Sequence, residues 1–453
     1  MNNKSNMYIP ERKIDFLLNG QRPRSGYLAF ALEEIFRFST EGLESYSFSR
    51  WSPLVFDAMV VAAAIEFGDR IVKRPSHGWR RNISLRIPVH DPNHWDSSEV
   101  FGALHEAIGF LTGDQWQISF KKRNSEAPAP KQDHLDFDFK ASAILAYSDG
   151  MDSLAVGAIV GDKIGQELIR VRVGADLPKS QRKRQAFAAV PYQIQIPCKD
   201  KETSARNRGF KFAMISAIAA YLSGADEIVI PESGQGAIGP ALISVGHAYP
   251  DYRNHPLFTK RMELFVTALF GKSIKYVFPR LWSTKGETLR EFMTIAGSTD
   301  WRSTKSCWRS SQWSSIGGHR RQCGICAACM LRRLSIHAAG LEDDPENYIC
   351  ENMSAPTLIE AVVPGFTKIN PAYEQYAIAG VLHLDHLADM DGLMARPVVQ
   401  RHARLFSSAL GLTGDEASAK LAALLERHAT EWKHYVDSLG AHSFIKKWVR
   451  TRS

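Results

Sequence analysis

The chain has 453 residues, which is too long for one ordinary hydrophobic core, so we expect two or three folded units. Hydrophobic residues at 44% and charged residues at 23% give the composition of a soluble globular protein. The longest apolar stretch, residues 54–65, is interrupted by Asp57 and is too short to cross a bilayer. No signal peptide is visible over residues 1–12. We therefore expect a cytoplasmic protein.

The net charge of +8 is concentrated in one stretch of the chain. Residues 170–211 contain eleven Lys or Arg against three Asp or Glu, and the rest of the chain is close to balanced. A local excess of positive charge favours phosphate-bearing partners, either a nucleotide or a nucleic acid such as tRNA or DNA. A solvated basic face without a partner is the alternative, and the charge alone leaves both open.

The first part of the chain, residues 1–135, has the pattern of a small α/β unit. A serine followed by proline marks one helix start, and apolar residues alternate with polar ones in two later stretches, as they do in strands. The predicted elements are a helix from Ser52 to Val72, a strand at 83–89, a helix at 98–111 and a strand at 116–120.

No catalytic constellation is apparent in this first part. Asp114, His90 and His105 stand isolated in the sequence, and we expect ordinary structural roles for them. The polar stretch 121–133 contains two prolines and is the best candidate for a linker to the next unit.

Residues 136–340 alternate between strand and helix patterns, beginning with a glycine loop. The apolar run at 143–147 is typical of a buried parallel strand, and we expect a helix at 152–160 after the loop. Strands alternating with helices indicate a doubly wound parallel sheet, so the predicted fold class is α/β. The further predicted elements are strands at 168–173, 193–197 and 227–231 and a long helix at 207–223.

The last part, residues 341–453, is predicted to be mainly helical. Thr413 and Glu416 have the spacing of a capping box. Beyond them apolar residues from Leu421 to Leu439 mark one helical face, which we expect to pack in a core. The basic tail, residues 446–452, is free to fray or to contact an acidic partner.

A polar loop with one glycine lies between the first central strand and its helix. Glycine lets the backbone approach a phosphate, and a helix N-terminus offers N–H groups and a favourable dipole. Asp152 fits an indirect Mg²⁺ contact or a helix cap, and an ordinary capped turn is the alternative for the whole loop. The loop is not of the Walker form, because no Gly-Lys-Ser/Thr follows. The predicted nucleotide-contacting residues are Ser148, Asp149, Gly150, Met151, Asp152 and Ser153.

Four of the six cysteines lie in one short segment. Their spacing is C-x15-C-x2-C-x2-C, and four thiolates fill the shell of a tetrahedral structural zinc ion. An iron–sulfur cluster is the main alternative, because short C-x2-C runs also bind clusters. The predicted metal ligands are Cys307, Cys323, Cys326 and Cys329.

These motifs, in this order, resemble the 7-cyano-7-deazaguanine synthase (QueC-like) family, a branch of the pyrophosphatase-loop ATPases with an adenine-nucleotide alpha hydrolase-like fold. The loop and the cysteine segment correspond to the phosphate loop and the zinc segment of that family. Five collinear matches over residues 143–340 carry the resemblance and leave both ends of the chain uncovered. The three matches between loop and cysteines are Ala205-Arg206-Asn207, Tyr249-Pro250-Asp251-x-Arg253, and Ser283-Thr284-Lys285 followed by Glu287.

The resemblance implies an ATP-dependent synthase or ligase that uses ATP with Mg²⁺ and binds Zn²⁺. The carboxylate of a 7-deazaguanine base would attack the α-phosphate, giving an acyl-adenylate and pyrophosphate, and an amine would then displace AMP. The family carries this through an amide to a nitrile. Release of AMP is also expected because the loop lacks the lysine that a Walker loop places on the β- and γ-phosphates.

Roles for individual residues follow from the same resemblance. Arg206 and Lys285 are the candidates for offsetting charge in the transition state, with Asp152 beside them and Asn207 at the nucleotide. The remaining motif would bind the base. Asp251 would accept hydrogen bonds from the exocyclic amine, and Arg253 would orient the substrate carboxylate. As the alternative, each charged residue forms a surface ion pair.

The chain departs from the family pattern in three places. Asp149 stands where the family loop has glycine, Arg172 to Asp176 replace a Y-G-Q-R-H segment, and Ala327 replaces an aspartate between the cysteines. These departures bear on the nitrile-forming step more than on adenylation.

The flanking parts resemble those of queuosine-synthase-like proteins of bacterial antiphage defence operons (QatC-like), in which the activated base is joined to a partner protein. One alternative is a tRNA-modifying pyrophosphatase-loop enzyme that adenylates a base for thiolation, for which only Cys198 and Cys350 remain as catalytic cysteines. The other alternative is an inactive nucleotide-binding scaffold.

Overall fold

The computed structural model describes residues 12–38, 52–126, 141–174, 187–198, 201–244, 249–308, 315–316, 319–392 and 395–450. Contacts between residues divide the chain into two compact units that interleave along the sequence. The first unit comprises residues 1–147, 166–230 and 251–277; the second comprises residues 148–165, 231–250 and 278–453. The three consecutive domains expected from the sequence, with boundaries near 135 and 340, are a different division and stay a prediction.

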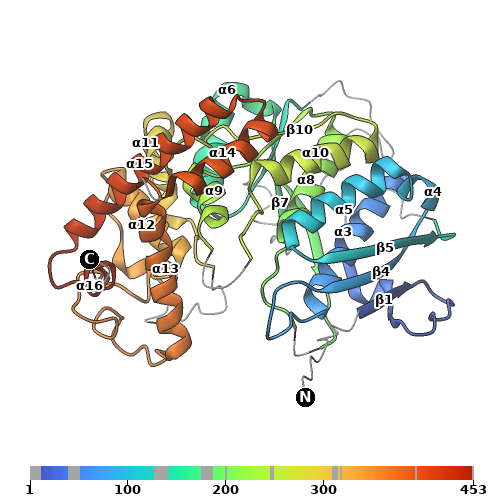
Figure 1. Ribbon diagram of the computed structural model, residues 1–453, viewed down its shortest axis with the longest axis horizontal. Helices are drawn as coiled ribbons and strands as arrows, with labels where there is room; N and C mark the ends of the chain where they lie inside the picture. Colours follow the sequence, from blue (N-terminus) through green and yellow to red (C-terminus); the bar gives the residue numbers. More distant parts are fainter. Residues whose placement is uncertain are drawn as a thin grey trace, which may run out of the picture. The chain divides into compact units, whose positions relative to one another are not determined.

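The first unit contains two sheets (Figure 1). The N-terminal sheet has four strands in the order β2-β1-β4-β5, all parallel. Its alternating apolar residues, among them Ile14, Leu85 and Ile118, are buried, as the period of a pleated strand requires. The strands are β1 (Arg12–Leu17), β2 (Leu28–Ala31), β4 (Asn82–Val89) and β5 (Gln115–Lys122).

The second sheet of this unit has the order β10-β9-β6-β7-β8-β3. Its strands are parallel except β3, which pairs antiparallel with β8. From β6 the chain builds outward to β7 and β8 on one side and to β9 and β10 on the other, and sheets of this kind bind ligands beyond the carboxyl ends of such strands. The strands are β3 (Phe36–Phe38), β6 (Ala143–Ala146), β7 (Leu168–Gly174), β8 (Phe187–Ile194), β9 (Glu227–Val229) and β10 (Lys275–Val277).

Helices fill the space between these two sheets. α3 packs against β4 and against α8, and it is buried from Val55 to Asp69 because it has neighbours on most sides. α8 packs in turn on β6, β7 and β9, and α10 packs on α5 and α8. The helices of the unit are α1 (Leu32–Ile35), α3 (Pro53–Ile71), α4 (Pro92–Trp95), α5 (Ser98–Thr112), α8 (Arg208–Ser223) and α10 (Pro256–Phe270).

The second unit is mainly helical, and α15 packs against α12, α13 and α14 in it. The predicted capping box of Thr413 and Glu416 starts α15, and the apolar face beyond it, including Leu421 and Trp432, is buried; both predictions are confirmed. The elements are α6 (Met151–Ile164), α9 (Gly234–Leu242), α11 (Lys285–Ala296), β11 (Ser315–Ile316), β12 (His319–Arg320), α12 (Ala327–Ala338), α13 (Pro371–Asp389), α14 (Arg396–Leu410), α15 (Gly414–Ser438) and α16 (Phe444–Arg450).

Several expectations for the first 135 residues need correction. The predicted linker begins too early, because Lys121 and Lys122 belong to β5; residues 127–140 lie outside the described part. His90 is not isolated, since its Nδ1 lies 2.6 Å from a carboxylate oxygen of Asp57. Asp114 binds two arginines, Arg74 and Arg81, in a buried cluster. Side chains far apart in sequence supply these partners, so the sequence pattern could not reveal them.

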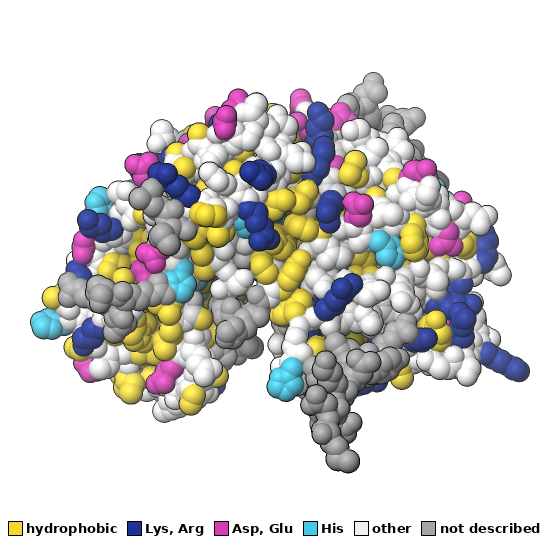
Figure 2. Space-filling view, in the orientation of Figure 1, with side chains coloured by type: hydrophobic (Ala, Val, Ile, Leu, Met, Phe, Trp, Pro, Cys, Tyr) yellow, Lys and Arg dark blue, Asp and Glu magenta, His cyan; other side chains and the backbone are white. Residues whose placement is uncertain are grey.

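Charge and membrane character are visible only in part. Much of the basic stretch, residues 175–186 and 199–200, lies outside the described residues, so its phosphate-bearing partner stays a prediction. On the face drawn in Figure 2, basic and acidic side chains are interspersed. Among the helices that the structure describes, none has both the length and the apolar character needed to cross a membrane.

Candidate functional site

The loop after β6 is closed by its two serines. The Ser153 hydroxyl accepts a hydrogen bond from the Ser148 backbone N–H at 3.1 Å and lies 2.9 Å from the Ser148 hydroxyl. The Ser148 hydroxyl in turn accepts from the Gly150 N–H at 3.2 Å. Gly150 is the N-cap of α6 and carries no side-chain cap, and the first N–H groups of a helix have no intrahelical acceptor. The loop therefore presents hydroxyls and N–H groups, which is the chemistry that a phosphate needs.

Asp152 lies in the first turn of α6 and pairs with a lysine 133 positions later. One carboxylate oxygen accepts a hydrogen bond from the Ser233 hydroxyl at 2.8 Å, and the other binds the Lys285 ammonium. Both charged side chains are only 10% exposed. The cap of α6 is Gly150, so Asp152 does not act as the helix cap that was one of its two predicted roles. The pair places a buried cation at the turn that follows the loop.

Lys285 is the first residue of α11, and the start of this helix is fixed from several sides. Thr284 caps it in a capping box with Glu287. The Lys285 backbone N–H donates to the side-chain oxygen of Gln235, from α9, at 2.8 Å. The Thr284 hydroxyl also donates to the Glu431 carboxylate, from α15, at 2.6 Å. The direction of the lysine is therefore set by helices that precede and follow it in the chain.

Gln235 connects these helices through a consistent set of donors and acceptors. Its amide nitrogen donates to Glu431 at 3.2 Å and lies 2.9 Å from Nδ1 of His428. His428 Nε2 lies 2.9 Å from the Leu384 carbonyl, so the hydrogen bonds assign the proton to Nε2 and leave Nδ1 as an acceptor. Burial lowers the pKa of His428 to about 4, which keeps the imidazole neutral, as this pattern requires.

In the first unit, the structure brings the two predicted arginines onto one carboxylate. Asp251 lies 3.1 Å from a guanidinium nitrogen of Arg206, and its two carboxylate oxygens share the Arg253 Nε–H, at 3.0 and 2.8 Å. Burial alone would raise the pKa of the Asp251 carboxyl, but the guanidinium groups of Arg253 and Arg206 outweigh it and lower that pKa. Two motifs that are 45 positions apart thus form one charged cluster.

Asn207 lies beside this cluster in sequence, at the N-cap of α8. Its side chain is 1% exposed, and neither its amide nitrogen nor its amide oxygen has a partner among the described residues. An unsatisfied buried amide costs about 1–3 kcal/mol, so a bound ligand or water that pairs with it would be favourable. The chain is closely packed two residues later, where a Cβ on Gly209 would lie 3.0 Å from the Cα of Arg253. A side chain at position 209 would therefore require Arg253 to shift by a few tenths of an ångström.

The four predicted metal ligands converge in the second unit. The sulfur atoms of Cys307, Cys323, Cys326 and Cys329 all lie within 4.8 Å of one another, and those of Cys323 and Cys329 are 3.9 Å apart. A tetrahedral zinc ion with Zn–S bonds of about 2.3 Å separates its sulfur ligands by about 3.8 Å. This spacing fits one ion better than a cluster of several irons, so the residues present fit zinc.

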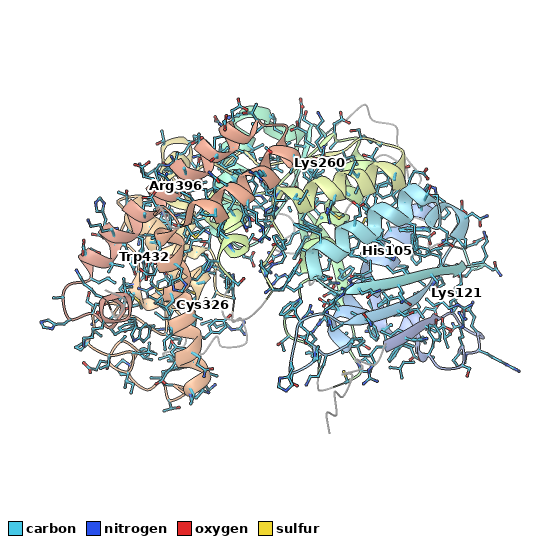
Figure 3. The ribbon with its side chains drawn as sticks, in the orientation of Figure 1. His105, Lys121, Lys260, Cys326, Arg396 and Trp432 are labelled. Atoms are coloured by element: carbon cyan, nitrogen blue, oxygen red, sulfur yellow. The ribbon has the colours of Figure 1, made fainter. Side chains whose placement is uncertain are left out.

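Backbone contacts around the cysteines fit the same interpretation. The N–H of Cys323 donates to the sulfur of Cys307, and the N–H of Cys326 to that of Cys323, each at 3.4 Å. Such bonds stabilise thiolate character, which a metal ligand needs. Cys326 is the N-cap of α12 and belongs to the same buried cluster as Trp432 (Figure 3). Gly380 of α13 permits this packing, because a Cβ there would lie 2.4 Å from a carbonyl oxygen of the segment.

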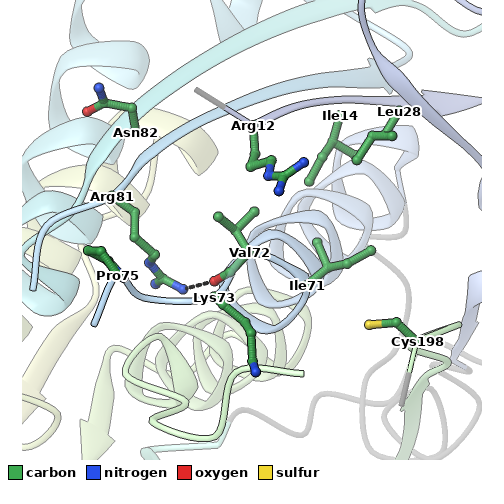
Figure 4. Close-up of a pocket in the computed structure, with 10 residues that line it drawn as sticks. All are labelled: Arg12, Ile14, Leu28, Ile71, Val72, Lys73, Pro75, Arg81, Asn82 and Cys198. Atoms are coloured by element: carbon green, nitrogen blue, oxygen red, sulfur yellow. Dashed lines mark hydrogen bonds between the residues drawn. The ribbon is translucent and has the colours of Figure 1, made fainter. Parts of the chain in front are cut away.

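The first unit also contains a cavity of about 410 Å³ that holds none of the predicted site residues (Figure 4). Apolar side chains such as Ile14 and Leu28 line it together with Arg12 and Arg81, and Arg81 donates to the Val72 carbonyl beside it. Arg12 borders residues outside the described part, so we assign no ligand to this cavity.

The predicted site residues therefore fall into three groups. The first group is the Ser148–Ser153 loop with Lys285, which pairs with Asp152. The four cysteines form the second group, and Arg206, Asp251 and Arg253 form the third. Sequence reasoning missed the residues that hold them, above all Gln235, because a polar residue inside a helix has no motif around it.

Comparison with known proteins agrees with the central part of this description. Residues 199–340 match the family model of the queuosine biosynthesis protein QueC, and no curated protein matches the chain. The matched segment contains the charged cluster, Asn207, Lys285 and all four cysteines, and it begins after the Ser148–Ser153 loop. The chain therefore carries a QueC-like segment, joined to a longer N-terminal part and a C-terminal helical part.

Proposed function

We propose that the chain catalyses ATP-dependent adenylation of a 7-deazaguanine carboxylate, followed by amide formation. The observation that carries this proposal is the Asp152–Lys285 pair in the turn after the loop, because it supplies a buried cation where a Walker lysine is lacking. The match of residues 199–340 to a queuosine biosynthesis family supports a deazapurine as the substrate class.

The reaction has two steps. A carboxylate oxygen of the base attacks the α-phosphorus of ATP, the bond to the β-phosphate oxygen breaks, and pyrophosphate leaves. An amine then attacks the acyl carbon, the carbon–nitrogen bond forms, AMP departs, and the nitrogen loses a proton. Lys285 and Arg206 offset the negative charge that develops in the first step. Mg²⁺, when bound, would neutralise the phosphates near Asp152.

The substrate end is assigned to the charged cluster. Asp251 is ionised, so it can accept hydrogen bonds from the exocyclic amine of a base, and Arg253 can bind a carboxylate. The Asn207 side-chain amide, which has no partner in the part of the chain that the structure describes, is assigned to the nucleotide. Zinc on the four cysteines would hold the segment that follows α11 in place and take no part in the reaction.

The amine is proposed to belong to a partner protein, as in the QatC-like defence proteins that the flanking parts resemble. Their presence on both sides of the QueC-like segment is the support for this finer assignment. Continuation of the amide to a nitrile is the alternative end of the pathway, for which ammonia would be the amine.

The test is incubation with α-labelled ATP and 7-carboxy-7-deazaguanine. We expect AMP and pyrophosphate only when the acid is present, and an amide in the mass spectrum when ammonia is added. ADP and phosphate as products would contradict the proposal, and ATP binding without turnover would favour the scaffold. Adenylation that depends on tRNA would favour the thiolation alternative, although Cys350 is poorly suited to it: it is fully buried, and burial raises its pKa to about 12.

A further inference from the structure

The loop that carries Arg206 and Asn207 is held by the N-terminal part of the chain, which lies outside the QueC-like match. Residues 202–207 precede α8, and residues 69–81 comprise the last turn of α3 and its connection to β4 in the same unit. Hydrogen bonds join these two segments along their length. They run from Glu202 N to Arg70 O at 2.8 Å, Arg74 N to Glu202 Oε2 at 2.9 Å, Arg74 Nε to Ser204 Oγ at 3.2 Å, and Asn207 N to Asp69 Oδ2 at 3.2 Å.

An aromatic ring from the same segment contacts the arginine itself. The guanidinium carbon of Arg206 lies 5.2 Å from the centroid of the Trp79 ring, within the range of a cation–π interaction. Two contacts fix the ring. The guanidinium carbon of Arg74 lies 3.7 Å from its centroid, and the indole N–H donates a hydrogen bond to the Thr112 carbonyl at 2.8 Å. Trp79 therefore offers a fixed face to Arg206, which binds Asp251 through its guanidinium group.

A buried, charge-balanced cluster underlies this segment. Arg81 binds Asp69 at 2.5 Å and Asp114 at 2.6 Å, and Arg74 binds Asp114 at 2.9 Å. The four side chains are at most 8% exposed. A fully paired buried network of this kind resists rearrangement, because separating any one partner leaves a buried charge uncompensated. The segment is thus a rigid support for the loop.

The loop needs such a support because its backbone is strained. Ala205 has φ of +43°, and it is the one non-glycine residue with positive φ among those the structure describes. This conformation costs an L-residue about 1–2 kcal/mol and persists when the surroundings determine it. The anchors at Ser204 and Asn207 lie on either side of Ala205, and Arg206 follows it directly.

We infer that Trp79 and Glu202 are positioning residues that direct the Arg206 guanidinium toward the substrate. The inference rests on the proposed function, because Arg206 is the group assigned there to the transition state. Trp79 acts through its contact with Arg206. Glu202 acts through its carboxylate, which accepts hydrogen bonds from the backbone N–H groups of Arg74, Thr203 and Ser204. The N-terminal part of the chain is then a component of the site.

The experiment compares four variants with the parent. Trp79→Leu removes the aromatic face, Trp79→Phe keeps it, and Glu202→Ala removes the acceptor. Glu360→Ala is the matched control, since this glutamate also accepts a hydrogen bond in a loop, from Thr357 at 2.8 Å in the second unit. The measurements are kcat and KM for AMP release, and hydrogen exchange of the amides in residues 201–208.

We expect Trp79→Leu and Glu202→Ala to lower kcat about tenfold while KM for ATP changes by less than about threefold. Trp79→Phe should recover most of the loss, and Glu360→Ala should behave as the parent. Unchanged kcat in both Trp79→Leu and Glu202→Ala would overturn the inference. Hydrogen exchange tests the inference even if the proposed function is wrong and the parent forms no AMP. In that case, faster exchange in residues 201–208 of both variants would support the positioning role. Unchanged exchange would overturn the inference.

Discussion

The Asp152–Lys285 pair allows the role of a charge in stability to be separated from its role in the reaction. Both side chains are 10% exposed, so removing one partner leaves the other charge buried without compensation. That loss costs about 3–5 kcal/mol for buried pairs. We therefore expect Lys285→Met and Asp152→Asn, made singly, each to lower the free energy of unfolding by about 3 kcal/mol.

The double variant Lys285→Met/Asp152→Asn removes both charges together. The side-chain amide introduced at position 152 can still accept from the Ser233 hydroxyl, and the methionine fills the space of the lysine stem, so most of the lost stability should return. AMP release should not return, because the cation that we assign to the transition state is gone. Loss of about 3 kcal/mol of transition-state stabilisation corresponds to roughly a hundredfold lower turnover.

Urea unfolding followed by tryptophan fluorescence measures the stability, and release of AMP from α-labelled ATP measures turnover. Lys260→Met is the control, because Lys260 forms an exposed pair with Glu263 at 2.6 Å and such pairs contribute less than about 1 kcal/mol (Figure 3). A stable and fully active Lys285→Met variant would refute both parts of the reasoning. A double variant with parental turnover would remove Lys285 from the reaction.

Three further predictions concern the second unit. Cys326→Ser should lose the one zinc ion expected per chain. Gly380→Ala should weaken zinc binding without changing a ligand, because a Cβ at position 380 would lie 2.4 Å from a carbonyl oxygen of the cysteine segment. Elemental analysis that finds iron, or no metal, in the parent would contradict this prediction. Glu431→Ala should lower both stability, by about 2 kcal/mol, and turnover, because two hydrogen bonds to a charged group are lost near Lys285; Glu426→Ala, exposed on the same helix, should change neither. The pKa of His428 is about 4 in the folded state and about 6.5 in the unfolded state, so the unfolded chain binds the proton first as the pH falls. The free energy of unfolding should therefore decrease between pH 6.5 and pH 4, by at most about 3 kcal/mol. An unchanged urea midpoint over that range would refute this prediction, and so would a pH dependence in His428→Gln as steep as in the parent.

Features with a local signature could be predicted from the sequence. The cysteine spacing placed four sulfur atoms in one cluster, because a metal site built on a short turn leaves its pattern in the chain. The resemblance assigned Arg206 and Asp251 to one active site, but neither the resemblance nor the spacing predicted their 3.1 Å contact. The capping box at Thr413 was predictable for the same reason, since both of its partners lie within four residues.

Features that depend on distant side chains could not be predicted. Gln235 and Glu431 are 196 positions apart, and each is a polar residue in an otherwise ordinary helix. Asp114 looked isolated because its partners are 33 and 40 positions away and share no periodicity with it. Hydrophobic period and turn chemistry report on neighbours within a few residues, whereas these networks are selected by the folded arrangement.

These distant networks explain why the QueC-like segment is not self-contained in this chain. The matched residues 199–340 are divided between both units, and β6, which pairs with both β7 and β9, lies before them. Arg206 is directed by contacts from residues 69–81, and the start of α11 with Lys285 is fixed through Gln235 to α15. The N-terminal part thus supports one group assigned to the transition state, and the C-terminal part supports the other. Since neither support leaves a motif, a change in either flank would alter the site while every recognisable motif stayed intact.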